Sequence, residues 1–435
     1  MDAQPPLTSE GSFDENPDGY AGGVATKTDT ASRGVLLLGP AFVAAIAYVD
    51  PGNVAANLTG GAQYGYLLVW VLLLSNLMAG LIQYQSAKLG LITGRSLPEL
   101  LGDRLRTPSR LAFWVQAELV AAATDLAEVI GGAIALHLLF NLPLLVGGVI
   151  VGAVSLGLLA IQSRRGQRPF EYVIVGLLAI IAIGFLSGLV IQPPDAGAVL
   201  GGLVPRFEGT GSVILAASML GATVMPHAIY VHSALARDRH GRAVGPLQTR
   251  RLLRITKWDV GIALGIAGLV NIGMLLLAAV NLRHVPNTDT IEGAHAAISN
   301  SLGPVIALVF AIGLLASGLA STSVGSYAGA TIMAGLLRRR IPLIVRRSVT
   351  LVPTLLLLAF GADPTAALVI SQVALSFGIP FALIPLLRLT RSRAVMGTSV
   401  NPVGITIALT ATVVLVLSLN VALIVLTVMP AFTGT

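Results

Sequence analysis

The stretch AYVDPGN at residues 47–53 lies near the middle of an apolar segment that covers residues 34–59. A proline inside a helix removes the hydrogen bond to the carbonyl group four residues earlier, and for Pro51 that carbonyl belongs to Ala47. The residue before the proline, Asp50, is also pushed out of the helical region of backbone angles. The stretch therefore predicts a helix that is broken at its centre, with a carboxylate at the break.

A second apolar segment, residues 211–235, carries the same interruption. Its central sequence ATVMPH ends in Met225, Pro226 and His227. Pro226 frees the carbonyl group of Ala222, and Met225 is displaced from helical angles as the residue before proline. Each segment thus offers one freed alanine carbonyl and one non-helical residue with a side chain able to bind a ligand.

The composition predicts a polytopic α-helical membrane protein. The chain has 435 residues, of which 55% are hydrophobic and 11% charged, whereas soluble domains carry about a quarter charged residues. The apolar residues gather in eleven blocks of about 20 residues, the length that spans a bilayer. The alternating ten-residue segments of a transmembrane β-barrel are not found. The blocks lie near residues 34–59, 66–92, 111–139, 143–161, 170–191, 211–235, 258–282, 304–335, 347–361, 365–387 and 402–429.

Basic residues fix the predicted orientation. With a cytoplasmic N-terminus, nearly all arginines between the blocks fall in inner segments, and the outer loops hold only Arg206 and Arg283. The net charge of +7 is therefore attributed to cytoplasmic loops and not to nucleic-acid binding. The basic segment 237–257 is suited to anionic lipid headgroups. Residues 1–32, rich in Asp, Gly, Pro, Ser and Thr, are predicted to form a disordered cytoplasmic tail.

The first ten blocks divide into two sets of five. A repeat with an odd number of spans must be inverted in the membrane, and inverted repeats with broken helices are a common transporter design. We therefore expect a first repeat over residues 33–200, a second over 201–392, and an eleventh helix with the C-terminus over 393–435. The breaks in spans one and six correspond in the two repeats.

The groups at the two breaks predict a site for a divalent transition metal. Asp50 supplies an anionic oxygen and Asn53 an amide oxygen, while Ala47 and Ala222 supply carbonyl oxygens. The thioether of Met225 shifts the preference of such an oxygen site toward softer ions. An aspartate at the membrane midplane costs about 2.5–3.5 kcal/mol on insertion scales, so it needs a compensating role such as cation binding. The chain has no cysteine, which excludes thiolate ligands and disulfides.

These motifs resemble those of the Nramp family of metal transporters. The stretches 47–53 and 222–227 are similar to its two signature motifs. The likeness extends to GGAQYGY at 60–66, to QAEL at 116–119 with TDLAE at 124–128, and to Ser371-Gln372.

The resemblance implies a LeuT-type fold with inverted five-helix repeats and proton-coupled import of manganese, ferrous iron and similar ions. It implies that Asp50, Asn53 and Met225 bind the metal together with the carbonyls of Ala47 and Ala222, and that Gln372 joins them in some states. From the residues alone, Gln372 is equally suited to an interhelical hydrogen bond. The metal is then cargo, no cofactor is required, and no obligate protein partner is evident. We expect a multi-pass protein of a bacterial plasma membrane.

Several ionisable side chains are candidates for proton movement. Glu118, Asp125 and Glu128 fall within a stripe of about 80° on one face of span three. Buried membrane acids often relay protons, and the resemblance links Asp125 and Glu128 to that role. Arg347 either pairs with this stripe or anchors the cytoplasmic end of span nine.

Two histidines of span six are further candidates, because histidine titrates near neutral pH. His227 lies beside the predicted site. His232 lies five residues on and about 140° around the helix, so it faces elsewhere. The mid-span amides Asn271 and Asn420 and the small residues of span eight, from Ser317 to Gly325, are interpreted as helix packing.

Three other functions are compatible with parts of the sequence pattern. A magnesium-type divalent transporter of the same superfamily would not need Met225. A sodium-coupled carrier of organic solutes on the same scaffold would respond little to metals. An intramembrane enzyme would need a catalytic constellation, and no HExxH, Walker-type loop or GxSxG with acid and base partners is found in the sequence.

Overall fold

The described residues are almost entirely helical, and no β-strand occurs among them. A computed structural model describes residues 39–165, 167–283, 285–288, 290–338 and 343–433. They belong to one compact unit, Leu38–Thr435. The predicted tail, residues 1–32, lies outside the described residues. The helical content of the described residues agrees with the all-α fold class expected from the composition.

Two of the predicted spans are broken where the prolines predict. The first consists of α1 (Pro40–Ile46), the short 3₁₀ segment η3 (Ala47–Val49) and α2 (Pro51–Tyr64). The sixth consists of α9 (Gly209–Thr223) and α10 (Pro226–His240). The other predicted blocks coincide with α3 (Val69–Thr93), α5 (Thr107–Phe140), α6 (Leu144–Arg165), α7 (Gln167–Ile191), α11 (Gly245–Asn281), α13 (Pro304–Ile332), α14 (Leu343–Ala359), α15 (Pro364–Thr390) and α17 (Val403–Thr433).

Not every one of these segments is apolar enough over its length to be recognised as a span by itself. Within the described chain, seven segments are long and apolar enough to cross a membrane, with α9 and α10 counted together as one segment. Shorter apolar helices cover Pro40–Val49, Leu144–Gly157 and Ser348–Ala359. The 25-residue α3 is about 37 Å long at 1.5 Å per residue, enough to cross a hydrocarbon core.

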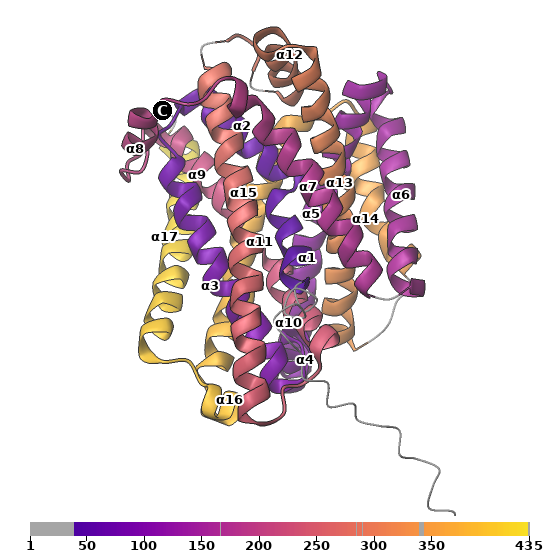
Figure 1. Ribbon diagram of the computed structural model, residues 1–435, viewed down its shortest axis with the longest axis vertical. Helices are drawn as coiled ribbons and strands as arrows, with labels where there is room; N and C mark the ends of the chain where they lie inside the picture. Colours follow the sequence, from indigo (N-terminus) through magenta and orange to yellow (C-terminus); the bar gives the residue numbers. More distant parts are fainter. Residues whose placement is uncertain (1–38, 166, 284, 289, 339–342, 434–435) are drawn as a thin grey trace, which may run out of the picture. The chain divides into compact units, whose positions relative to one another are not determined.

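The broken helices lie inside the bundle. The α1–η3 segment packs against α7, α10, α11 and α13, and α2 packs against α5, α9, α11 and α15. In Figure 1, α3, α7 and α11 run roughly along the long axis of the bundle. Both breaks are therefore enclosed by protein, the only setting in which unwound backbone is tolerated at membrane depth.

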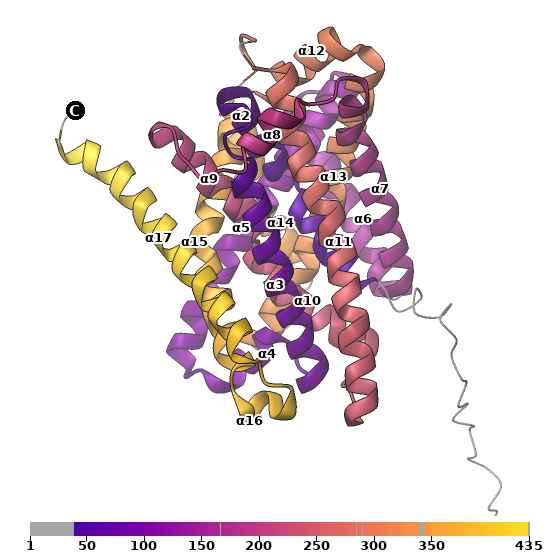
Figure 2. The ribbon, with the colours of Figure 1, turned by 60° about the vertical axis from the view of Figure 1, so that its left-hand side comes forward.

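Four short helices were not predicted, because each is too short to register as an apolar block. They are α4 (Leu97–Arg104), α8 (Ala196–Gly201), α12 (Ile291–Leu302) and α16 (Arg393–Met396). Figure 1 places α12 at one end of the bundle and α4 and α16 at the other. Since the arginine-rich segments lie at the α4 and α16 end, that end faces the cytoplasm. Figure 2 shows α17 leaning away from the bundle toward its C-terminus.

Candidate metal-binding site at two helix breaks

Asp50 caps the second half of the first broken helix. It has an extended backbone, with φ −71° and ψ 167°, as expected for a residue before proline. Its Oδ1 accepts a hydrogen bond of 2.8 Å from the backbone N–H of Asn53. One carboxylate oxygen thus satisfies a free donor of the first helical turn, which is the usual work of an N-cap side chain. Pro51 follows at the position where its missing N–H costs nothing.

Met225 occupies the matching position at the second break. Its backbone is also extended, with φ −70° and ψ 123°, and α10 begins at Pro226. A thioether accepts hydrogen bonds only weakly, and Met225 makes no side-chain cap. It is fully buried and belongs to the main apolar core. The two breaks therefore share a backbone form, but only the first is capped by its own side chain.

The carbonyl groups exposed by the first break find partners on helices of the second half. Asn271 of α11 donates from Nδ2 to the Tyr48 carbonyl oxygen at 2.7 Å. Ser317 of α13 donates from Oγ to the Val49 carbonyl oxygen at 2.6 Å. From the sequence we expected both residues to serve helix packing, and their hydrogen bonds to the freed carbonyls were not predicted. Their signal was present, a mid-span amide and a mid-span hydroxyl, but the sequence does not reveal which carbonyl each one meets.

The side chain of Asn53 joins the two breaks. Its Nδ2 donates to Asp50 Oδ1 at 2.8 Å and to the Ala222 carbonyl oxygen at 3.0 Å. The carbonyl that Pro226 deprives of its helical donor is thus bound by an amide of the other repeat. The sequence predicts that the breaks meet, and this contact brings Asp50, Asn53 and Ala222 together.

Gln372 of α15, a third helix, lies beside Asp50 and completes the set of polar side chains at the breaks. Its Nε2 lies 3.4 Å from Asp50 Oδ2. Gly52 and Gly221 allow this close approach: a Cβ atom on Gly52 would lie 1.8 Å from Gln372 Nε2, and one on Gly221 would lie 2.1 Å from the Gln372 carbonyl oxygen. The glutamine therefore fits between the two breaks, and neither glycine tolerates a side chain without rearrangement.

The site is closed to solvent and retains acceptor oxygens. The side chains of Asp50, Asn53, Met225 and Gln372 have a relative exposure of 0%. Ala47 and Ala222 are buried as well. Among the described residues, Asn53 Oδ1 and Gln372 Oε1 are buried acceptors without a hydrogen-bond donor. Buried acceptors of this kind are costly unless a ligand uses them, and a cation is the ligand that two amide oxygens beside a carboxylate favour.

The ligand set differs from that of a conventional metal centre. Across the described chain, no group of three or more His, Asp or Glu side chains is placed to hold a metal. The candidate site has one carboxylate, with its other donors drawn from amides, carbonyls and a thioether. Such a set would carry little negative charge and would therefore hold a cation less tightly than a cluster of carboxylates.

The three acidic candidates for proton movement all belong to α5. Asp125 and Glu128 of α5 are buried, at 2% and 1% exposure, whereas Glu118 is only half-buried. The carboxylate of Glu128 lies against Gly325 of α13, where an added Cβ would be 3.0 Å from Oε1. Arg347 belongs to α14, and its side chain lies outside the described residues.

The two histidines face different neighbours, as their spacing predicts. His227 Nδ1 lies 3.4 Å from the hydroxyl of Thr124, which is adjacent in sequence to Asp125. His232 Nδ1 lies 2.8 Å from Gln83 Oε1 on α3, and Gln83 Nε2 in turn donates to the hydroxyl of Tyr48. His227 therefore faces the acidic helix, and His232 faces α3 and the first break. No sequence pattern pointed to Gln83, and Thr124 appeared only within the TDLAE stretch at 124–128, without a role of its own.

Comparison with known proteins identifies relatives of the same architecture. The family model described as natural resistance-associated macrophage protein-like, Nramp, matches residues 41–426. The divalent metal cation transporter MntH of Mycobacterium tuberculosis is 62% identical over 392 residues, which cover 90% of this chain and 92% of that protein.

Solved structures of similar proteins point to the same family of folds. A manganese transporter from Eremococcus coleocola, solved in complex with an aromatic bis-isothiourea substituted compound, is 31% identical, with a TM-score of 0.82 over 93% of this chain and 89% of that one. MhsT, solved with L-phenylalanine, is 14% identical with a TM-score of 0.57 over 88% of this chain and 98% of that one, a likeness of fold alone.

Proposed function

The chain belongs to the Nramp family, and from this premise we propose that it imports manganese, ferrous iron and similar ions through the site at its two helix breaks. It is a multi-pass transporter of divalent metal ions in the plasma membrane and not an enzyme. The metal is cargo. We propose further that Asp50, Asn53 and Met225 bind it directly.

A single observation carries this assignment. The amide of Asn53 contacts both Asp50 and the Ala222 carbonyl, so groups from two interrupted helices that could bind a metal lie together in one buried place. Asp50 would supply the charge, and the oxygens of Asn53, Ala47 and Ala222 would replace water molecules of the hydrated ion. Met225 would favour softer transition metals over magnesium and calcium. Gln372 would contribute its Oε1 when α15 moves closer.

The geometry supports transport by alternating access. All four ligand side chains are shielded from both sides in this conformation. Movement of the half-helices α1 and α10 on one side, or α2 and α9 on the other, would open the site to one compartment at a time. We propose that the halves belong to two inverted repeats, residues 33–200 and 201–392, with α17 outside the repeats and residues 1–32 as a cytoplasmic tail.

We propose that protons accompany the metal through the polar side of α5. His227 would pass a proton toward Asp125 and Glu128; this is supported by the 3.4 Å contact between its ring and the hydroxyl of Thr124, which lies on α5 with both acids. His232, Glu118 and Arg347 are the other candidates for this route. Inward movement of one proton charge yields about 2.3 kcal/mol per 100 mV of membrane potential. A single chain acting without a protein partner is sufficient for this mechanism.

Uptake into proteoliposomes tests the proposal. The purified protein is reconstituted, and manganese entry and lumenal pH are followed together for the parent and for Asp50→Ala. We expect the parent to accumulate manganese and acidify the lumen, and Asp50→Ala to lose both signals. Metal entry without acidification would refute the coupling, and equal uptake by Asp50→Ala would refute the site.

Competition separates this function from its rivals. Excess magnesium should inhibit manganese entry only weakly if Met225 selects softer ions. Strong inhibition by magnesium would instead indicate a magnesium-type transporter. Sodium-driven uptake of an amino acid or amine would indicate an organic solute carrier on the same fold.

A further inference from the structure

A basic cavity lies at the cytoplasmic end of the bundle, away from the metal site. It has a volume of about 770 Å³ and is formed by the end of α3, the start of α11 and the α16 region. Four cationic side chains line it: Lys88, Arg242, Arg250 and Arg393. No acidic side chain lines it among the residues that the structure describes. The cavity therefore has the electrostatic character of an anion site.

One of these cations, Lys88, is held in place by a neutral partner. Lys88 is 7% exposed, and its Nζ donates to Asn401 Oδ1 at 2.8 Å. Asn401 is neutral, so this bond orients the ammonium group without cancelling its charge. Two residues later α17 begins, and its first turns expose Val403 and Ile407, as lipid-facing helices do. The cavity thus lies where the headgroups of the inner leaflet are expected.

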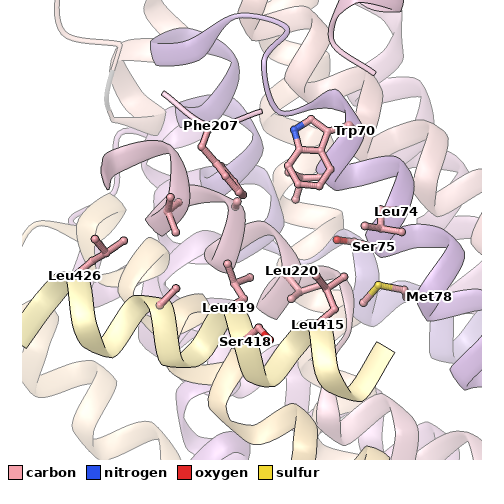
Figure 3. A pocket seen from close by; sticks show the side chains of 14 residues that line it. Trp70, Leu74, Ser75, Met78, Phe207, Leu220, Leu415, Ser418, Leu419 and Leu426 are labelled. Atoms are coloured by element: carbon pink, nitrogen blue, oxygen red, sulfur yellow. The ribbon is translucent and has the colours of Figure 1, made fainter. Parts of the chain in front are cut away.

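An apolar seam lies between α3 and α17, on the outer side of the basic cavity. Its inner part is a cavity of about 270 Å³ lined by residues that include Leu77, Leu81 and Ala411. Its outer part is a cavity of about 360 Å³. Figure 3 shows this outer part, where Trp70, Leu74 and Met78 of α3 face Leu415 and Leu419 of α17. Leu81 and Lys88 are seven residues apart, about 10 Å along the axis of α3.

We propose that this basic cavity binds the phosphate headgroup of an anionic glycerophospholipid, with an acyl chain lying in the seam between α3 and α17. The charges favour a phosphate, because four of the described lining residues are cationic and none of them is acidic. The seam selects a lipid over a free anion, because its apolar lining stabilises hydrocarbon and gains nothing from a soluble phosphate. The position at the cytoplasmic end assigns the lipid to the inner leaflet.

Native mass spectrometry of the full-length protein tests the headgroup site. The protein in detergent is titrated with phosphatidylglycerol or with phosphatidylcholine, and bound lipid is counted. We expect the variant Arg250→Gln with Arg393→Gln to bind phosphatidylglycerol about thirtyfold more weakly, at about 1 kcal/mol for each basic residue. The matched control is Arg251→Gln with Arg254→Gln, which removes the same charge from exposed arginines of α11 that do not line the cavity. Equal loss in the control, or equal binding of phosphatidylcholine, would overturn the proposal.

A second pair of variants tests the seam. Ala411→Phe fills the inner cavity from an exposed position on α17 and should weaken binding of the lipid, whereas Val414→Phe, exposed on the same helix but outside the cavity, should not. Inorganic phosphate is the soluble probe. If millimolar phosphate displaces the lipid and Ala411→Phe has no effect, the site binds free anions and the lipid assignment is wrong. These readouts do not depend on metal transport.

Discussion

The two helix breaks have similar backbone conformations but differ in the hydrogen bonds that stabilise them. At the first break Asp50 caps α2, and side chains of α11 and α13 bind the carbonyls of Tyr48 and Val49. At the second break Met225 makes no cap, and the freed carbonyl of Ala222 is bound by Asn53 from the first. The first break is thus anchored by polar contacts with the second half of the chain, while the second depends on the first.

This difference separates two functions. The first break places a charge in the membrane and needs a fixed geometry, because a buried carboxylate is tolerated only with partners. The second break contributes a flexible, uncharged thioether whose softness affects which ion is preferred. We infer that the first break determines whether a divalent ion binds and the second which one, and variants at each break test this division.

The largest effect is expected from Asp50→Asn. The amide oxygen still caps the Asn53 N–H, so the fold of the break should persist, but the only charge among the proposed ligands is lost. Supporting residues around metal sites cost 10–100-fold when changed, so loss of a charged ligand should lower manganese uptake by more than about 100-fold. Uptake in proteoliposomes and circular dichroism measure the two properties. Uptake within a few-fold of the parent would show that charge at the first break is dispensable.

Met225→Ala should have a smaller and selective effect. Manganese still meets the oxygen ligands, but discrimination against magnesium and calcium falls because the soft donor is gone. A change of about 1.4 kcal/mol in the difference between two binding free energies alters selectivity tenfold. Competition of magnesium against manganese uptake measures this ratio. An unchanged ratio would contradict the role assigned to the second break.

Ser317→Ala should destabilise the first break without removing a ligand. It leaves the buried Val49 carbonyl without its donor, and interhelical hydrogen bonds in membranes contribute about 0.6–1.7 kcal/mol. Thermal unfolding in detergent measures the loss. Ser323→Ala is the control on the same helix, because the Ser323 hydroxyl bonds to the Leu319 carbonyl of its own helix. Equal decreases in unfolding temperature for both variants would indicate that the hydrogen bond to Val49 does not stabilise the first break.

The smallest effect concerns the cytoplasmic end of α10, where Arg237 pairs with Glu99 of α4. Burial alone would raise the pKa of Glu99, but hydrogen bonds from Ser96 and Arg237 outweigh it and hold the pKa below its usual value. The pair should therefore stabilise the protein above a pH of about 4.3 and lose its effect as the pH falls through the lowered pKa. The carboxylate is 33% exposed, so a few tenths of a kcal/mol are expected. Unfolding of the parent and of Glu99→Gln between pH 3 and 7 should differ only above this transition; a constant difference would contradict it.

Pattern and composition predicted much of the fold. The apolar blocks predicted the helices because a bilayer demands segments of fixed length, and the prolines at 51 and 226 marked the breaks. The short helices α4, α8, α12 and α16 were not predicted, because elements outside the hydrocarbon core need no long apolar run. Asp50, Asn53 and Ala222 were predicted from the two breaks and Gln372 from the family resemblance, and the structure brings these four residues together.

Proline alone did not determine where a helix breaks. Helix α15 contains Pro380 and Pro385 and remains helical. The carbonyls that these prolines free belong to Ser376 and Phe381, which accept hydrogen bonds from Asn420 of α17 at 3.0 Å and from Tyr230 of α10 at 3.3 Å. Neighbouring helices thus satisfy the freed groups and preserve the helix, and no local pattern reveals such neighbours.

The sequence by itself determined that the chain crosses a membrane many times, that two of its helices are interrupted, and which oxygen and sulfur atoms lie at the interruptions. These properties follow from segment length, residue chemistry and backbone sterics, all of which are local. Only the tertiary structure decided that Asn53 reaches Ala222, that Asn271 and Ser317 bind the exposed carbonyls, and that Gln372 lies between two glycines. Each of these contacts joins residues more than a hundred positions apart, and the packing of whole helices sets their distances.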